Sequence, residues 1–224
     1  MISRHVVTAP RVKVCCISSV HEAAVAVAHG ASALGLVSRM PSGPGVVDED
    51  TIAAIVATVP PAVATFLLTS AVTVEAIVAQ QHHTRPTTLQ LVDHLTPDVH
   101  RALRAELPGI TLVQVVHVED EASVAYALAV APSVDALLLD SGRLTAPVRE
   151  LGGTGRTHDW GLSRRIRDGC GRPVFLAGGL HAGNVGDAIR AVEPFGLDLC
   201  TGVRTDGALD PRRLAAFMEA AGAA

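Results

Sequence analysis

Short apolar runs and segments of helical period alternate along the whole chain. The apolar runs are rich in Val, Leu and Ile at consecutive positions, as parallel strands buried on both faces are. The segments between them carry apolar residues three and four positions apart, which is typical of amphipathic helices. The pattern predicts strands at 12–17, 33–37, 63–69, 87–91, 110–117, 134–139, 173–180 and 196–203, and helices at 21–29, 48–58, 73–81, 96–106, 119–130, 159–167, 184–192 and 211–221.

Regular alternation of strands and helices predicts an α/β fold. A chain of 224 residues is long enough to close eight such units into a (β/α)8 TIM barrel. Hydrophobic residues make up 49% of the chain and aromatic residues only 3%, so we expect an aliphatic core. No linker or low-complexity tract interrupts the pattern, and we therefore expect a single domain over residues 1–224.

Two glycine-containing turns near the end of the chain predict an anion site. One apolar run ends in Gly178 and Gly179, the next ends in Thr201 and Gly202, and a segment of helical period follows each. Glycine lets an anion approach the backbone N–H groups, and a helix N-terminus favours negative charge. In (β/α)8 barrels, phosphate commonly binds after strands 7 and 8. We expect phosphate at these four residues, although ordinary tight turns would also account for the glycines.

Three reactive side chains lie at strand ends, where this fold builds its active sites. They are Cys15, Asp140 and Asp198. Taken alone, Cys15 also fits a small buried apolar residue. Asp140 follows an apolar run and must be paired or face a polar cavity, since burying a bare carboxylate is costly, although it could also cap a helix or join an ion pair in a loop. Asp198 interrupts an apolar run and faces either solvent or the mouth of the barrel.

Charge and composition limit the partners and the location. The net charge is −4 with both signs scattered, so no basic patch favours nucleic-acid binding. No apolar run reaches the roughly 18–20 residues that span a membrane, and the N-terminus lacks the apolar core of a signal peptide. The cysteines at 15, 16, 170 and 200 lack the spacing of a zinc site. We expect no metal, free thiols and a cytoplasmic location.

Two segments have the character of motifs. They are Val12-Lys-Val-Cys-Cys-Ile-Ser18 and Gly152-Gly-Thr-Gly-Arg-Thr-His-Asp-Trp160. The first resembles the opening K-[IV]-C-G-I-[TS] of the phosphoribosylanthranilate isomerase family of tryptophan biosynthesis, and the second resembles the loop after that family's sixth strand. Further segments resemble the same family in the same order along the chain, at 30–37, 137–140, 177–180, 184–185 and 198–203.

This resemblance implies an intramolecular oxidoreductase, an aldose–ketose isomerase that performs an Amadori rearrangement without metal or redox cofactor. N-(5-phosphoribosyl)anthranilate would become 1-(2-carboxyphenylamino)-1-deoxyribulose 5-phosphate. By resemblance, Asp140 is the general acid and Cys15 the general base, while Asp198 contacts the sugar hydroxyls. Gly155 lies in a loop that closes over the site, and the two glycine-containing turns bind the substrate phosphate. The expected partner is this phosphorylated sugar-amine, bound by a monomer or homodimer.

The chain departs from the family pattern mostly where the aromatic amine would lie. Pro44 stands where the family has an arginine that pairs with the anthranilate carboxylate, and Val92 replaces a histidine. Losing such a bidentate contact weakens binding roughly tenfold to a hundredfold. Arg39, in the same loop, either compensates or is simply solvated. Near the other end, Cys16 replaces a glycine, and the family's S-S-G-V-E reads Cys-Thr-Gly-Val-Arg at 200–204.

Two alternative functions remain open. The chain could be a paralogue that acts on a different phosphoribosylamine, because the carboxylate-binding arginine is missing. It could also be a non-catalytic barrel that binds a sugar phosphate. The joint presence of Cys15 and Asp140 argues against a pure binding protein, since binding alone needs neither proton-transfer group.

Overall fold

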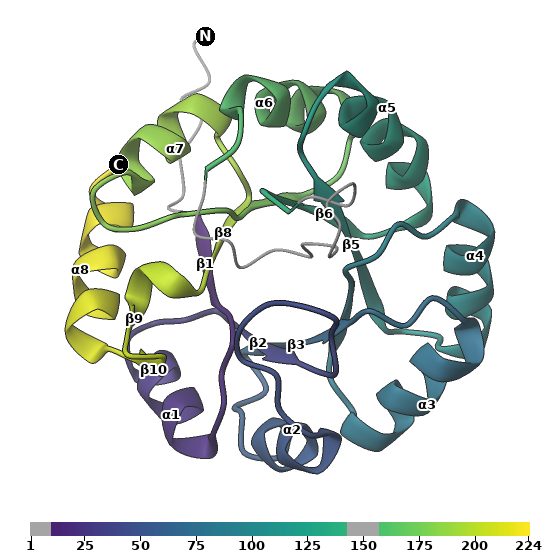
Figure 1. Ribbon diagram of the computed structural model, residues 1–224, viewed down its shortest axis with the longest axis horizontal. Coiled ribbons are helices and arrows are strands. Elements are labelled where there is room, and N and C mark those ends of the chain that lie inside the picture. Colours follow the sequence, from purple (N-terminus) through teal and green to yellow (C-terminus); the bar gives the residue numbers. More distant parts are fainter. Residues whose placement is uncertain (1–9, 143–156) are drawn as a thin grey trace, which may run out of the picture.

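The computed structural model describes residues 10–142 and 157–224. Eight parallel strands close into a barrel in sequence order, with the helices as an outer ring (Figure 1), which confirms the predicted (β/α)8 fold. The strands are β1 Arg11–Val14, β2 Ala33–Val37, β3 Ala64–Thr69, β4 Thr88–Leu91, β5 Thr111–His117, β6 Ala136–Asp140, β7 Val174–Leu176 and β8 Gly196–Leu199. The helices are α1 Val20–Ala28, α2 Glu49–Val56, α3 Val74–Thr84, α4 Pro97–Glu106, α5 Glu121–Val130, α6 Trp160–Gly169, α7 Val185–Val192 and α8 Pro211–Gly222.

Three predicted strands are too long at their carboxyl ends. The runs 12–17, 173–180 and 196–203 continue as apolar sequence, but the strands end at Val14, Leu176 and Leu199. The last residue of each run is buried, but it lies beyond the strand. An apolar run indicates that residues are buried and does not show that their backbone is extended. The tail of the last run forms a 3-10 turn, η2 (Thr201–Val203), and a short hairpin follows it, β9 (Arg204–Thr205) with β10 (Ala208–Leu209).

Helix starts follow the polar residues that precede them. Asp48 accepts a hydrogen bond from the backbone N–H of Thr51 at the start of α2. Pro97 occupies the first turn of α4, because proline has no N–H to leave unpaired there. Like Asp48, other residues accept a backbone N–H in the first turn of the helix that follows them. They are Ser19, Thr73, Asp120, Asp159 and Asp210, before α1, α3, α5, α6 and α8.

Alternation along the strands builds two apolar clusters. Outward residues such as Leu34 and Leu137 pack in the larger cluster, which extends to the helices. Inward residues such as Phe66, Leu138 and Phe175 form the second cluster inside the barrel. Because successive side chains point to opposite faces, a polar residue at an inward position near a strand end faces the mouth of the barrel. In the described part of the chain, no helix is long and apolar enough to cross a membrane.

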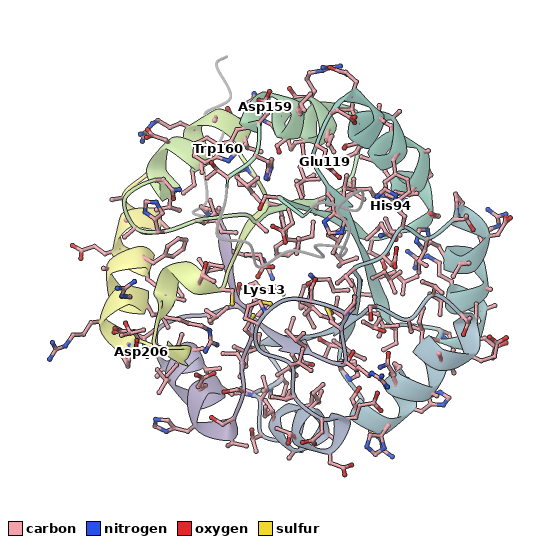
Figure 2. The ribbon with its side chains drawn as sticks, in the orientation of Figure 1. Lys13, His94, Glu119, Asp159, Trp160 and Asp206 are labelled. Atoms are coloured by element: carbon pink, nitrogen blue, oxygen red, sulfur yellow. The ribbon has the colours of Figure 1, made fainter. Side chains whose placement is uncertain are left out.

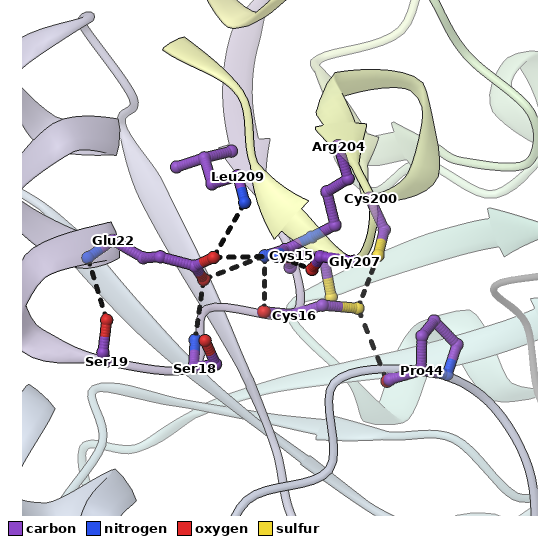
Figure 3. Close-up of polar contacts among 10 residues, drawn as sticks. All are labelled: Cys15, Cys16, Ser18, Ser19, Glu22, Pro44, Cys200, Arg204, Gly207 and Leu209. Atoms are coloured by element: carbon purple, nitrogen blue, oxygen red, sulfur yellow. Dashed lines mark hydrogen bonds and ion pairs between the residues drawn. The ribbon is translucent and has the colours of Figure 1, made fainter.

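A buried ion pair holds the turn after β1 to the hairpin after β8 (Figure 3). Arg204 Nη1 lies 3.0 Å from Glu22 Oε1, and Arg204 Nη2 also donates to the backbone carbonyls of Cys15 and Cys16. Glu22 accepts hydrogen bonds from the backbone N–H groups of Ser18 and Leu209. Burial alone would raise the pKa of Glu22, but these donors together lower it. The pair therefore fixes the backbone on which Cys15 sits.

We predict that Glu22→Ala destabilises the fold by about 3 kcal/mol, because it leaves the guanidinium of Arg204 buried without its partner. The free energy of unfolding in urea measures this. Since folding lowers the pKa of Glu22, the stabilisation is present above the usual carboxyl pKa of about 4.3 and is lost as pH falls below it. Glu121→Ala is the matched control, because its ion pair with Arg165 is exposed. Equal destabilisation by the two variants would contradict the prediction.

Candidate active site

A cavity of about 700 Å³, including its open mouth, lies at the carboxyl ends of the strands. Most residues predicted to form the site line it: Cys15, Asp140, Asp198, Gly178, Gly179 and Thr201. They come from β1, β6, β7 and β8 or from the turns that follow these strands. Asp140, expected just after its strand, is the last residue of β6. A thiol, two carboxyl groups and a glycine-containing turn therefore face one space.

Two predicted site residues, Gly202 and Gly155, are not among the described residues that line this cavity. Gly202 lies behind its wall, where a methyl group on it would collide with the carbonyl oxygen of Leu180. Its lack of a side chain thus lets the turn after β8 approach the turn after β7. Gly155 lies outside the described residues.

A residue to which the sequence reasoning assigned no role lies near the axis of the barrel (Figure 2). Lys13 is completely buried, and its Nζ lies 2.8 Å from Oδ1 of Asp198. Burial would lower the pKa of Lys13, but Asp198 and the neighbouring thiol of Cys15 raise it above its usual value. The ammonium therefore keeps its charge. The available signal was a charged residue inside an apolar strand, the same signal that identified Asp198.

The two alternatives for Asp198 are now resolved, because its side chain points into the barrel and only 7% of the residue is exposed. Burial and the charge of Asp140 raise the pKa of Asp198, while Lys13 lowers it. With an ammonium at 2.8 Å, we assign the pair as ionised. A carboxylate held this way can still accept hydrogen bonds from a ligand with its other oxygen.

Cys15 lies beside this pair. A methyl group on Gly35 would lie 2.7 Å from Cys15 Sγ and 3.0 Å from Lys13 Nζ, so both atoms reach the same space above Gly35. Interaction with the side chain of Cys16 lowers the pKa of Cys15, burial raises it, and the charge of Lys13 lowers it, with a net decrease. A thiol with a lowered pKa carries more thiolate near neutral pH, which is the form that accepts a proton.

The glycine turn after β7 has the geometry of an anion site. Gly178 and Gly179 have φ angles of 85° and 62°, which suit glycine and few other residues. Within residues 10–142 and 157–224, their backbone N–H groups donate to no acceptor. Asn184 holds the turn by donating to the carbonyl of Gly179 and accepting from the N–H of His181. The turn therefore places these two backbone donors at the cavity wall.

The loop after β2 forms another part of the cavity wall with neutral side chains. Met40, Ser42 and Pro44 line the cavity there. Arg39 is exposed and lines a separate hollow with Ser70 and Gln80. Of the two alternatives for Arg39, the structure favours the solvated one. In the part of the chain that the structure describes, no lysine or arginine lines the cavity at this loop.

Comparisons with known proteins agree with the fold. The family model for N-(5'-phosphoribosyl)anthranilate isomerase matches residues 12–220. The isomerase of Halorubrum lacusprofundi is 38% identical over 214 residues, 95% of this chain and 96% of that protein. The crystal structure of the isomerase from Thermotoga maritima superposes with a TM-score of 0.80 at 29% identity, covering 96% of this chain and all of that one. A further isomerase structure, in complex with reduced 1-(o-carboxyphenylamino)-1-deoxyribulose 5-phosphate, matches with a TM-score of 0.78 at 26% identity, with coverage of 96% and 100%.

We predict that Gly202→Ala weakens the binding of inorganic phosphate roughly tenfold or more, because the added methyl group must push the turn away from Leu180. Calorimetric titration with phosphate measures the affinity. Gly222→Ala is the control, since a methyl group there meets open space at the end of α8. Unchanged phosphate affinity in Gly202→Ala would show that the turn after β8, which contains Gly202, does not contribute to the anion site.

Proposed function

The chain belongs to the N-(5'-phosphoribosyl)anthranilate isomerase family, and from this premise we propose that it converts N-(5'-phosphoribosyl)anthranilate to 1-(2-carboxyphenylamino)-1-deoxyribulose 5-phosphate. The observation that carries the proposal is that Cys15 and Asp140 line the same cavity as the glycine turn after β7. A pure binding site for a sugar phosphate would need the turn but neither proton-transfer group.

Asp140 is the proposed general acid. It protonates the ring oxygen of the ribose as the bond between C1 and that oxygen breaks, which leaves an open-chain iminium ion. Cys15 is the proposed general base and removes the proton from C2, which gives an enolamine. Protonation of C1 of this enolamine and loss of the proton from the C2 hydroxyl give the C2 carbonyl of the aminoketose. These two transfers return Cys15 and Asp140 to their starting protonation states. Each proton transfer contributes typically 10²–10⁴-fold to the rate.

Lys13 and Asp198 support the base in this proposal. The ammonium of Lys13 favours the thiolate of Cys15 and stays in place because Asp198 neutralises it. The second oxygen of Asp198 is the proposed contact for the sugar hydroxyls. The N–H groups of Gly178 and Gly179, with Thr201, are proposed to hold the phosphate.

The amine end of the substrate is the part that this chain binds in its own way. The family's arginine is absent, and Arg39 is exposed outside the cavity. We propose that the aromatic ring packs against Met40 and Pro44, with weaker recognition of its carboxylate than an arginine would give. The alternative of a different phosphoribosylamine rests on this same neutral loop.

All four cysteines are free thiols. Free thiols support a reducing compartment, and we propose the cytoplasm. Whether the protein works as a monomer or a homodimer stays a prediction from the family resemblance.

We predict that Cys15→Ala and Asp140→Asn each lower kcat on N-(5'-phosphoribosyl)anthranilate by about 100-fold or more, because each removes one proton-transfer group. Loss of substrate fluorescence follows the reaction. Both variants are expected to keep their affinity for inorganic phosphate, which separates lost chemistry from lost folding. Wild-type protein that is inert on this substrate but active on another phosphoribosylamine would identify the paralogue. Stabilisation by ligand without any turnover, unaffected by Cys15→Ala, would favour the binding protein.

We predict that Cys16→Gly moves the acidic limb of the pH profile of kcat/KM to higher pH. The base must be a thiolate, so the rate rises as pH passes the pKa of Cys15. Cys16 lowers that pKa, and removing its side chain therefore raises it. Glycine suits the φ of 62° at this position, so the variant is expected to fold. An unchanged limb would show that the Cys16 proton goes to the carbonyl oxygen of Pro44, 3.6 Å away, instead of to Cys15.

A further inference from the structure

We infer that Cys16 and Cys200 form a reversible disulfide site at the mouth of the barrel, which takes a low-molecular-weight disulfide as its oxidant. Closing this bond would switch the isomerase to a less active form. The effect of the disulfide on turnover rests on the proposed function. The formation of the disulfide does not depend on that function.

The two sulfur atoms already meet. Cys16 Sγ lies 2.6 Å from Cys200 Sγ, although 184 positions separate the residues in sequence (Figure 3). A disulfide holds its sulfur atoms about 2.05 Å apart, so bond formation needs only a small movement.

The backbone around the two cysteines also suits a disulfide. β1 pairs with β8 where the barrel closes, and the last paired residues are Val14 and Leu199. Cys15 continues this ladder, because its N–H donates to the carbonyl of Leu199. Neighbouring strands run about 4.8 Å apart, and disulfides span Cα separations of roughly 4.4–6.8 Å. Cys16 and Cys200 leave this ladder one or two residues after its last pair.

The cysteines occupy two of the positions where the chain departs from the family pattern that it resembles. Cys16 replaces a glycine and keeps a left-handed φ of 62°, a conformation that disfavours any side chain. Cys200 replaces a serine directly before the turn of Thr201. A strained side chain that touches a second unusual thiol indicates a paired role rather than two separate packing changes.

Exposure sets the order of the exchange steps. Cys200 is partly exposed, whereas Cys16 is only 5% exposed. The thiolate of Cys200 attacks one sulfur of the oxidant RSSR, which forms Cys200–S–SR and releases RS⁻. Cys16 then loses its proton and attacks the Cys200 sulfur, which closes the protein disulfide and releases the second RS⁻. The two thiol protons go to the two leaving thiolates, so two RSH form for each RSSR that is reduced.

The bond would act on both ends of the site. It joins the residue after Cys15 to the residue before Thr201, and all four residues line the cavity. It also removes the S–H group of Cys16, which lowers the pKa of Cys15 in the reduced protein. Oxidation therefore leaves less of Cys15 as thiolate near neutral pH, beside a tethered phosphate turn. Reduction by an excess of dithiol restores both.

The test treats the reduced full-length protein with oxidised glutathione and blocks the remaining thiols with N-ethylmaleimide. Tryptic digestion without reductant then releases residues 14–39, with Cys15 and Cys16, and residues 191–204, with Cys200. The expected product is these two peptides joined, with the mass of their sum less two hydrogen atoms plus one N-ethylmaleimide on Cys15. It should be absent in Cys16→Ser and Cys200→Ser and present in Cys15→Ser. Cys170→Ser is the matched control, because Cys170 is partly exposed at the end of α6.

Turnover is measured in parallel. Oxidation is expected to lower kcat/KM tenfold or more in wild-type protein and in Cys170→Ser, with recovery after dithiothreitol. A joined peptide that persists in Cys16→Ser, or glutathione adducts without any joined peptide, would overturn the site. Equal loss of turnover in Cys200→Ser would overturn the switch. A protein that forms the bond but isomerises no phosphoribosylamine would refute the proposed function and leave the disulfide site standing.

Discussion

The ion pair between Lys13 and Asp198 is the constraint on which the rest of the site depends. An unpaired ammonium inside an aliphatic barrel is too costly to persist, so Lys13 requires a carboxylate at the same level. The register of β1 and β8 supplies it, because Lys13 lies directly opposite Asp198. This pairing occurs where the barrel closes, and closure and charge neutralisation therefore reinforce each other. A slip of either strand by one residue would turn its charge toward the helices and leave the other charge without its partner inside the barrel.

Once that register is set, the chemistry follows from the alternation of side chains. Cys15 lies two residues after Lys13 and Cys200 two residues after Asp198, so all four side chains face inward at the carboxyl end. The ammonium then acts on a thiol in a setting of low dielectric, where charges interact more strongly than in water. The backbone beyond β1 needs its own support because its carbonyl groups leave the sheet. Arg204 provides that support from the opposite end of the chain.

The sequence predicted the barrel, and most of the residues that it assigned to the site line the cavity, because alternation and strand-end position are local features. It could not show which charges meet. Lys13 lay inside a recognised motif, but its role depends on Asp198, a partner that only the closed barrel brings near. Arg204 appeared only as a departure from a motif, since Glu22 lies on a distant helix. The predicted ends of β1 and β8 lie beyond the observed ends at Val14 and Leu199, because burial continues into the turns that follow.

The departures from the family pattern form one connected change rather than two. Cys16 and Cys200 touch each other beside the phosphate turn. Cys16 also contacts the carbonyl of Pro44, and a methyl group on Gly45 would collide with the backbone and side chain of Cys16. The loop that lost its arginine therefore packs directly on the cysteine that replaced a glycine. Because protein interiors transmit strain through close packing, a change at either position constrains the other. Recognition of the amine and the state of the thiol pair are thus coupled through Cys16, one residue from the proposed base.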